Sequence, residues 1–215
     1  RDRSVSRGLG DVYKRQMQYT PVKEKALELN IPVYQPEKVK NPEFVDILRE
    51  INPDVIVVIA FGQILSKEIL DLPKYGCINV HASLLPKYRG AAPIQWAVID
   101  GEEETGVTTM YMAEGLDTGD VIDTAVIKLD EKETGGSLFD KLAIEGGKLI
   151  VETLSKLENG TATRTPQDDE KSSYAGKITK ELGQIDFTKP AVTIERLIRG
   201  LNPWPSAYTT LDGKA

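Results

Sequence analysis

A run of seven apolar residues at positions 55–61 (VIVVIAF) constrains the fold more than any other feature. A strand with no polar face must be covered on both sides, which is typical of a parallel strand between helices. The remaining chain alternates between helix and strand patterns. We expect helices over residues 21–30, 42–51, 66–72, 92–100, 137–158 and 193–201, and strands over residues 31–34, 55–61, 77–80, 107–112 and 121–129. This alternation predicts an α/β fold with a mostly parallel sheet.

Capping residues mark several of these helix boundaries. Asn41 and Pro42 are typical of an N-cap followed by proline at the first helical position. A pattern resembling a capping box begins at Ser137 and opens the longest predicted helix. Asn159 and Gly160 are expected to end that helix.

The two ends of the chain depart from the pattern. Residues 1–16 show no helical or strand period, and their tail, DVYKRQ, matches one frame of a common transposon sequencing adapter. We expect them to be an artefact of cloning or sequencing, outside the fold. Residues 17–162 form the predicted main domain, and residues 163–182 a polar linker. Residues 183–215 begin a second domain, in which residues 206–211 start a strand and the turn at Asp212 and Gly213 lacks a second strand.

The composition narrows the possible functions. The chain carries 27 Lys and Arg against 33 Asp and Glu, a net charge of −6. Residues 1–16 contribute five basic and two acidic groups, so the remainder carries −9, which argues against a generic nucleic-acid binder. With one cysteine, Cys77, and one histidine, His81, the sequence predicts neither a disulfide nor a zinc site. No signal peptide and no apolar run of about 18 residues is visible, so we expect a soluble cytoplasmic protein.

Candidate catalytic residues gather after two predicted strands. Asn79 and His81 are two residues apart, so their side chains point to the same side of a strand. The turn at residues 115–120 (GLDTGD) supplies Asp117, a carboxylate that could meet His81. An amide, an imidazole and a carboxylate suit acyl transfer to an amine, because they stabilise an oxyanion, move a proton and orient the imidazole. Residue types alone leave a structural role open for both His81 and Asp117.

Other chemistries lack their motifs. Ser83 has no second histidine to activate it, and the chain contains no G-x-S-x-G sequence. Neither a P-loop nor a G-x-G-x-x-G sequence after a strand is present, so nucleotide hydrolysis and dinucleotide binding are not supported.

Residues 78–122 (INVHASLLPKYRGAAPIQWAVIDGEEETGVTTMYMAEGLDTGDVI) resemble the signature region of the folate-dependent formyltransferases. The segments RGAAPIQWA and GLDTGD are closer to the branch that acts on methionyl-tRNA than to the branch that acts on glycinamide ribonucleotide. The segments TPVKEKALELNIPVYQP, SYAGKITKELGQIDF and LIRGLNPWPSAYT agree with the same branch. The resemblance therefore extends from about Met17 to the end of the chain.

The resemblance implies a fold and a reaction. The fold is a Rossmann-like sheet of the formyltransferase type, followed by an OB-like β-barrel. The donor is 10-formyltetrahydrofolate, the acceptor is the amino group of methionine on initiator tRNA, and no metal is implied. By position, Asn79, His81 and Asp117 match the catalytic residues. The loop that contacts folate corresponds to Ser83, Leu84, Leu85 and Pro86.

The sequence also departs from the family pattern. The family's first strands and a basic loop should precede Met17, and the barrel beyond its opening strand should follow residue 215, so we expect a fragment of a monomeric enzyme. Two alternatives stay open. One is a formyltransferase that acts on a sugar-nucleotide amine or on glycinamide ribonucleotide, and the other is an inactive folate-binding fragment.

Overall fold

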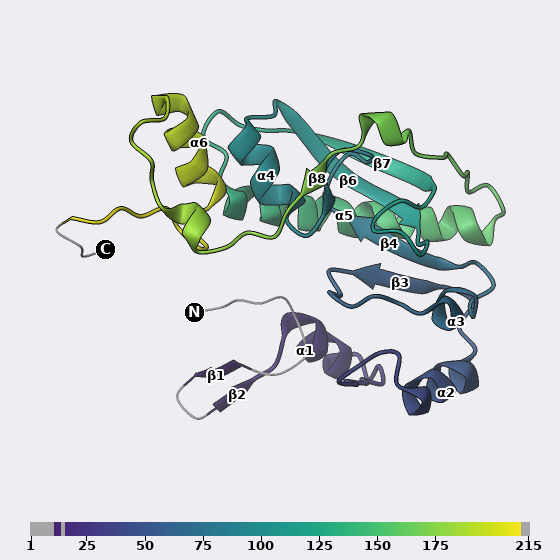
Figure 1. The fold of residues 1–215 in the computed structure, drawn as a ribbon. Helices are drawn as coiled ribbons and strands as arrows, with labels where there is room; N and C mark the ends of the chain where they lie inside the picture. Colours follow the sequence, from purple (N-terminus) through teal and green to yellow (C-terminus); the bar gives the residue numbers. More distant parts are fainter. Residues whose placement is uncertain (1–10, 14–15, 212–215) are drawn as a thin grey trace. The chain divides into compact units, whose positions relative to one another are not determined.

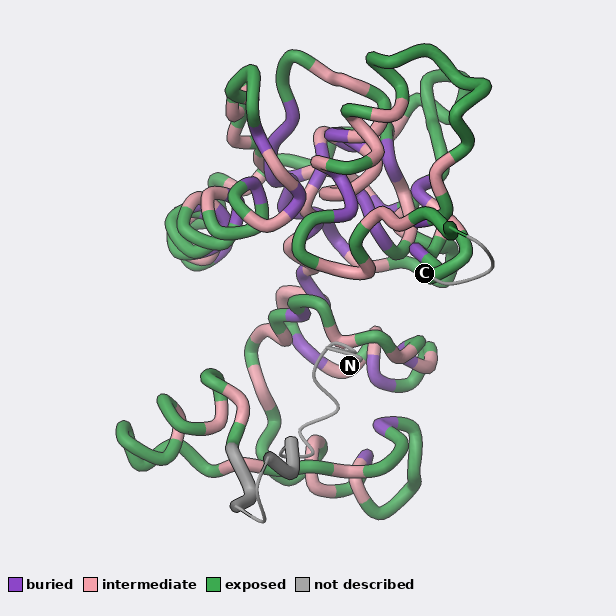
Figure 2. Tube along the Cα trace, turned by 90° about the vertical axis from the view of Figure 1, so that its left-hand side faces the viewer, coloured by how far each residue is buried: buried purple, intermediate pink, exposed green. Residues whose placement is uncertain are grey.

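The computed structural model describes residues 11–13 and 16–211, and it divides the chain into two compact units. The first unit ends at Cys77 and the second begins at Ile78. Figure 1 labels helices and strands of both units and colours the chain by residue number. This division falls inside the predicted main domain of residues 17–162. Buried positions are most frequent in the second unit (Figure 2), which also contains all of the predicted site residues.

The first unit consists of short elements. Strands β1 (Asp11–Tyr13) and β2 (Gln16–Gln18) pair antiparallel. The predicted helices are confirmed, and the apolar run forms a strand. These elements are α1 (Pro21–Glu28), α2 (Pro42–Ile51), β3 (Ile56–Ile59) and α3 (Lys67–Leu70). Proline opens both α1 and α2, where its missing N–H would have no partner in any case.

The first unit differs from the predictions at three places. Residues 31–34 form no strand, because Pro32 has no N–H for a ladder and Ile31 lies more than half exposed. Regular structure was not expected over residues 1–16, yet Asp11–Tyr13 is strand β1, while residues 1–10 and 14–15 lie outside the described chain. In β3, Ile59 is more than half exposed, so the described residues do not cover both faces of this strand.

Cys77 is buried, as expected of a small apolar residue. Its Sγ lies 3.5 Å from the carbonyl oxygen of Ile69. Burial, and secondarily the carboxylate of Asp71, raises the pKa of the Cys77 thiol to about 11. The thiol therefore stays protonated at neutral pH and is a poor nucleophile.

The second unit confirms the predicted order of helices and strands. Its long elements are β4 (Cys77–His81), α4 (Pro93–Asp100), β6 (Glu104–Tyr111), β7 (Val121–Lys128), α5 (Gly135–Glu158) and α6 (Ala191–Gly200). Two short strands were not predicted, β5 (Arg89–Gly90) and β8 (Tyr174–Ala175). Short 3₁₀ turns at Asp169–Lys171 and Glu181–Gly183 lie on either side of β8.

The long strands of the second unit pair antiparallel. In β4 and β6, His81 lies opposite Thr108 and Asn79 lies opposite Met110, and β6 then pairs with β7. The expected parallel pairing is limited in this unit to β5 and β8. The difference has a simple cause at β6 and β7, because the short connection between them can join antiparallel neighbours but not parallel ones.

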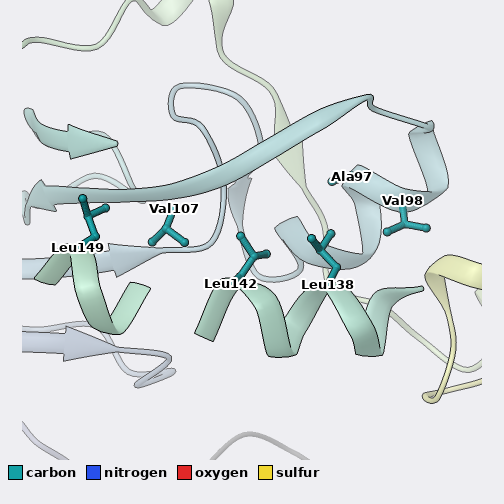
Figure 3. Close-up of a cluster of buried hydrophobic side chains, with 6 residues drawn as sticks. All are labelled: Ala97, Val98, Val107, Leu138, Leu142 and Leu149. Atoms are coloured by element: carbon teal, nitrogen blue, oxygen red, sulfur yellow. The ribbon is translucent and has the colours of Figure 1, made fainter. Parts of the chain in front are cut away.

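The core of the second unit lies between the sheet and α5. Figure 3 shows Leu138, Leu142 and Leu149 of α5 directed toward the strands and α4, where they meet Val107, Ala97 and Val98. Val80 of β4 packs against the same cluster. A Cβ atom at Gly146 of α5 would lie 3.3 Å from Val80, so the helix and strand are in close contact there. Since alternate side chains point to opposite faces, Asn79 and His81 lie on the face of β4 away from α5.

Helix α5 begins earlier than its capping pattern predicted. Its N-cap is Thr134, whose hydroxyl accepts a hydrogen bond from the N–H of Ser137 at 3.1 Å. Ser137 is thus the N3 residue of a capping box, three positions after the N-cap, rather than the N-cap itself. Glycine is unfavourable inside helices, so Gly135 did not indicate that the helix begins before Ser137. A Cβ atom at position 135 would lie 2.4 Å from the carbonyl oxygen of Gly200, so a larger residue would not fit there.

The segment predicted as a linker, residues 163–182, belongs to the second unit and packs against the rest of it. Thr165 forms an antiparallel bridge with Val121, and β8 pairs with β5. Ile178 is buried with Leu201 and Ala92 in a second apolar cluster. Because the segment is mostly polar, its composition did not indicate that a few of its residues would be buried or paired. The strand expected over residues 206–211 is wrong, since this part forms only isolated bridges such as that between Gln184 and Tyr208.

Glu133 is a buried carboxylate beside the α5 N-terminus. It accepts hydrogen bonds from Lys141 Nζ at 2.5 Å, from Asp130 N at 3.2 Å and from the Ser137 hydroxyl. Burial acts to raise the pKa of this carboxyl, but the hydrogen bonds from Lys141 and Ser137 outweigh it and hold the pKa below the ordinary value of 4.5.

We predict that Glu133→Gln lowers the free energy of unfolding at pH 7 by about 1–3 kcal/mol, because a charged hydrogen-bond acceptor is lost. The depressed pKa stabilises the folded protein above pH 4.5, and this contribution disappears as the pH falls through the folded-state pKa. The difference between wild type and variant should therefore shrink below pH 4.5 in urea unfolding curves. The exposed Glu131→Gln is the control, and an equal loss from that variant would contradict the prediction.

Candidate active site

His81 stands at the end of β4, buried between two acceptors. Its Nε2 lies 2.8 Å from the carbonyl oxygen of Tyr88. A carbonyl oxygen only accepts, so Nε2 carries the proton and Nδ1 has the lone pair in the neutral ring. Nδ1 lies 3.7 Å from Oδ2 of Asp117, within ion-pair range but too far for a hydrogen bond.

Asp117 occupies the turn between β6 and β7. Its φ is +52°, a left-handed conformation that Asp tolerates better than most residues. Oδ2 accepts a hydrogen bond of 2.8 Å from the N–H of Gly90. The same oxygen faces His81, so one backbone donor fixes the carboxylate that approaches the imidazole.

Asn79 shares a face of β4 with His81 and is half-buried. Its side-chain amide makes no hydrogen bond to another residue in the described part of the chain. The amide N–H groups are therefore available to a ligand oxygen. The structure thus brings His81 and Asp117 together and leaves Asn79 beside them on the same side of the strand.

The loop after β4 is tied to β6. Thr108 donates its hydroxyl to the carbonyl of Ser83 at 2.7 Å and accepts the N–H of Leu85 at 3.2 Å. The Ser83 hydroxyl is fully buried and donates to the carbonyl of Lys87 at 2.7 Å. A Cβ at Gly106 would lie 2.6 Å from a methyl carbon of Leu84, which therefore sits directly over the strand. Ser83 closes the loop, so a ligand can reach the loop backbone, Leu84 and Pro86 more readily than the serine hydroxyl.

Sequence reasoning missed the residues that hold this site together. Tyr88 holds the imidazole through its carbonyl group and Gly90 holds the carboxylate through its N–H, so neither contribution leaves a side-chain signature. Gly90 has a φ of +111°, and a Cβ there would lie 2.6 Å from the ring of Tyr174. Only glycine fits this position. The sequence shows a glycine at position 90, but it does not show that the close approach of Tyr174 requires one.

A cavity of about 390 Å³ adjoins the loop without reaching the catalytic candidates. It is lined by Lys87, Tyr88, Trp96, Asp100, Glu102, Lys171, Ser173 and Tyr174. The Tyr88 hydroxyl oxygen lies 2.9 Å from Oδ2 of Asp100 and 2.8 Å from Oε1 of Glu102, so its single proton is shared between two carboxylates. Burial, followed by these hydrogen bonds, raises the pKa of Tyr88 well above its ordinary value, so the phenol stays protonated.

Residues 11–13 and 16–211 contain no group of three or more His, Cys, Asp or Glu side chains placed to hold a metal ion. No helix among them is long and apolar enough to cross a membrane.

The arrangement suits proton transfer beside a developing negative charge. A proton taken up at Nδ1 of His81 would face the Asp117 carboxylate, which stabilises the resulting imidazolium. The amide of Asn79 can donate to an oxyanion on the same face of β4. These are the requirements of acyl transfer to an amine, without a covalent intermediate on the protein.

Comparison with known sequences decides the family. Residues 5–154 match the formyl transferase family, and residues 177–215 match the formyl transferase C-terminal domain. The chain belongs to the formyl transferase family. The resemblance and the fold of the formyltransferase type are thereby confirmed, with only part of the C-terminal domain represented and no closed barrel among the described residues.

Individual formyl transferases show how far the similarity extends. A methionyl-tRNA formyltransferase of Agathobacter rectalis is 66% identical over 198 residues, which cover 92% of this chain and 64% of that protein. A methionyl-tRNA formyltransferase of Clostridioides difficile is 61% identical over 191 residues, covering 89% of this chain and 62% of that protein. The chain thus spans somewhat less than two thirds of the length of these relatives.

Solved structures share the fold. A sugar N-formyltransferase from a Shewanella species superposes with a TM-score of 0.73 at 21% identity, covering 89% of this chain and 76% of that one. The sugar 3N-formyl transferase WlaRD, solved in the presence of dTDP and 5-N-formyl-THF, gives a TM-score of 0.68 at 26% identity. That match covers 86% of this chain and 64% of WlaRD.

Proposed function

We propose that the protein transfers the formyl group of 10-formyltetrahydrofolate to the amino group of methionine on initiator methionyl-tRNA. The observation that carries this proposal is the 66% identity to a methionyl-tRNA formyltransferase over 92% of the chain. It is supported by the juxtaposition of His81 and Asp117 at 3.7 Å, with Asn79 on the same face. The tRNA substrate belongs to translation initiation, so we place the protein in the cytoplasm, as a monomer without membrane attachment.

The reaction exchanges one carbon–nitrogen bond for another. The amino nitrogen of methionine attacks the formyl carbon, a C–N bond forms, and the carbonyl electron pair moves to oxygen. When the tetrahedral intermediate collapses, the bond from carbon to N10 of the folate breaks, and its electron pair stays on N10. The attacking amine loses one proton and N10 gains one, so no proton is consumed overall.

Three side chains provide this chemistry. Nδ1 of His81 takes the proton of the amine and returns it to N10, because Nε2 is engaged with Tyr88. Asp117 stabilises the imidazolium between these two transfers. Asn79 donates to the oxyanion, a contribution of about 3–4 kcal/mol in comparable sites.

We assign the folate to the loop formed by Ser83, Leu84, Leu85 and Pro86. The folate is a co-substrate here, and a formylated folate accompanied the structural relative WlaRD. Since the Ser83 hydroxyl donates to the Lys87 carbonyl inside the loop, the contacts of this loop with the folate would come from its backbone and from its apolar side chains. The C-terminal part from residue 183, which follows the packed segment of residues 163–182, would begin the domain that helps to hold tRNA.

A test of acceptors separates this function from its alternatives. The protein is incubated with 10-formyltetrahydrofolate and, separately, with initiator methionyl-tRNA, an amino-sugar nucleotide and glycinamide ribonucleotide. Because the chain spans 64% of the Agathobacter protein, a hybrid completed with that protein's remaining segments is assayed in parallel. We expect formylmethionyl-tRNA to be the product. Formylation of the sugar nucleotide instead, which the likeness to WlaRD makes the second candidate, would overturn the assignment.

We predict that His81→Ala and Asp117→Ala each slow formyl transfer by at least about 100-fold, which is typical of a positioned acid–base group. Single-turnover rates at saturating folate measure the effect on the chemical step. The exposed Glu114→Ala on the same turn is the control. Losses below threefold in both folded variants would remove these residues from the mechanism.

A further inference from the structure

Gln167 lies in the segment predicted to be a linker, yet its side-chain amide is fully engaged. Nε2 donates to the carbonyl oxygen of Asp117 at 2.8 Å and to that of Gly119 at 2.7 Å. Oε1 accepts from Arg89 twice, from Nε at 3.0 Å and from Nη2 at 2.8 Å. The side chain of Gln167 therefore joins the turn that carries Asp117 to the start of β5.

The arginine that holds Gln167 is itself fixed. Its guanidinium is largely buried, and Nη2 also lies 2.8 Å from Oδ1 of Asp169. Arg89 pairs with Tyr174 where β5 meets β8. The next residue, Gly90, donates its N–H to Asp117 Oδ2. Gly90 of β5 thus holds the carboxylate of Asp117 directly, and Arg89 of β5 holds Gln167, which in turn holds the Asp117 backbone.

The turn that carries Asp117 is not held by burial of the residues next to Asp117. Leu116 and Thr118 on either side of Asp117 are exposed, and Asp117 adopts a left-handed conformation. Gly119 runs so close to β6 that a Cβ there would lie 1.7 Å from the carbonyl oxygen of Tyr111. The carbonyl groups of Asp117 and Gly119 converge on a single NH₂ group, which fixes the direction of the peptide between them.

From these contacts we infer that Gln167 is a positioning residue for the reaction, which holds Asp117 at its distance from His81. The catalytic part of this inference rests on the proposed formyl transfer. A displacement of about 1 Å in a catalytic group can slow a reaction by about 100-fold. Gln167 touches no reacting atom, so its effect must pass through Asp117.

The substitution Gln167→Glu separates positioning from general packing. Glutamate keeps the length of the side chain and still accepts from Arg89, with an added charge that strengthens this pair. It cannot donate to the carbonyl oxygens of Asp117 and Gly119, and a carboxylate oxygen would instead repel them. If Gln167 served only to anchor Arg89, Gln167→Glu would retain activity, whereas the positioning role predicts its loss.

The test combines Gln167→Glu and Gln167→Ala with Asp117→Asn in a double-mutant cycle. We expect each Gln167 variant to lower kcat by at least tenfold, with the KM for 10-formyltetrahydrofolate within about threefold of wild type. Because Gln167 acts through Asp117, each double variant should be within about twofold of Asp117→Asn alone. The inference would be overturned if the Gln167 and Asp117 substitutions lowered kcat independently, so that their effects multiplied in the double variants. A Gln167→Glu variant with wild-type kcat would also overturn it.

A second measurement does not depend on activity. Hydrogen–deuterium exchange of the full chain should be faster over residues 113–120 in both Gln167 variants, and unchanged in the control Gln184→Ala, whose side chain is exposed. Unchanged exchange over this turn would also overturn the inference. If wild type transfers no formyl group, the proposed function fails, and the exchange result still decides whether Gln167 positions the turn.

Discussion

The backbone carbonyl of Tyr88 accepts a hydrogen bond from Nε2–H of His81, and the rest of the site depends on this contact. It fixes the ring so that Nδ1 faces Asp117, which leaves one nitrogen with a free lone pair next to a carboxylate. The contact requires the loop after β4 to return to the end of its own strand. Thr108 of β6 and the internal hydrogen bond from Ser83 to the Lys87 carbonyl hold the loop in that path.

Much of this arrangement could be predicted from local sequence. The helices and strands of the second unit follow from apolar patterns, and the spacing of Asn79 and His81 already places them on one face of a strand. The glycine-bounded turn similarly indicated Asp117 as a partner for His81. These predictions succeed because each rests on neighbours in the sequence, where periodicity and turn chemistry dominate.

The predictions that failed concern contacts between distant segments. Gln167 looked like part of a polar linker, because nothing in its neighbourhood shows that its amide meets a turn about 50 residues earlier. The parallel β5–β8 pair consists of two residues from each strand, too few to produce a pattern. Long-range hydrogen bonds of this kind are set by packing, and composition does not reveal them.

Because His81 is the only histidine in the chain, its ring can be observed without assignment. Nitrogen-15 NMR of histidine-labelled protein, recorded at a pH at which the imidazole ring is neutral, reports which ring nitrogen carries the proton. We expect the Nε2–H form, held by the Tyr88 carbonyl, with an unprotonated Nδ1 toward Asp117. A neutral ring protonated at Nδ1 would contradict this expectation, since the nitrogen assigned to take the proton of the amine would then have no free lone pair.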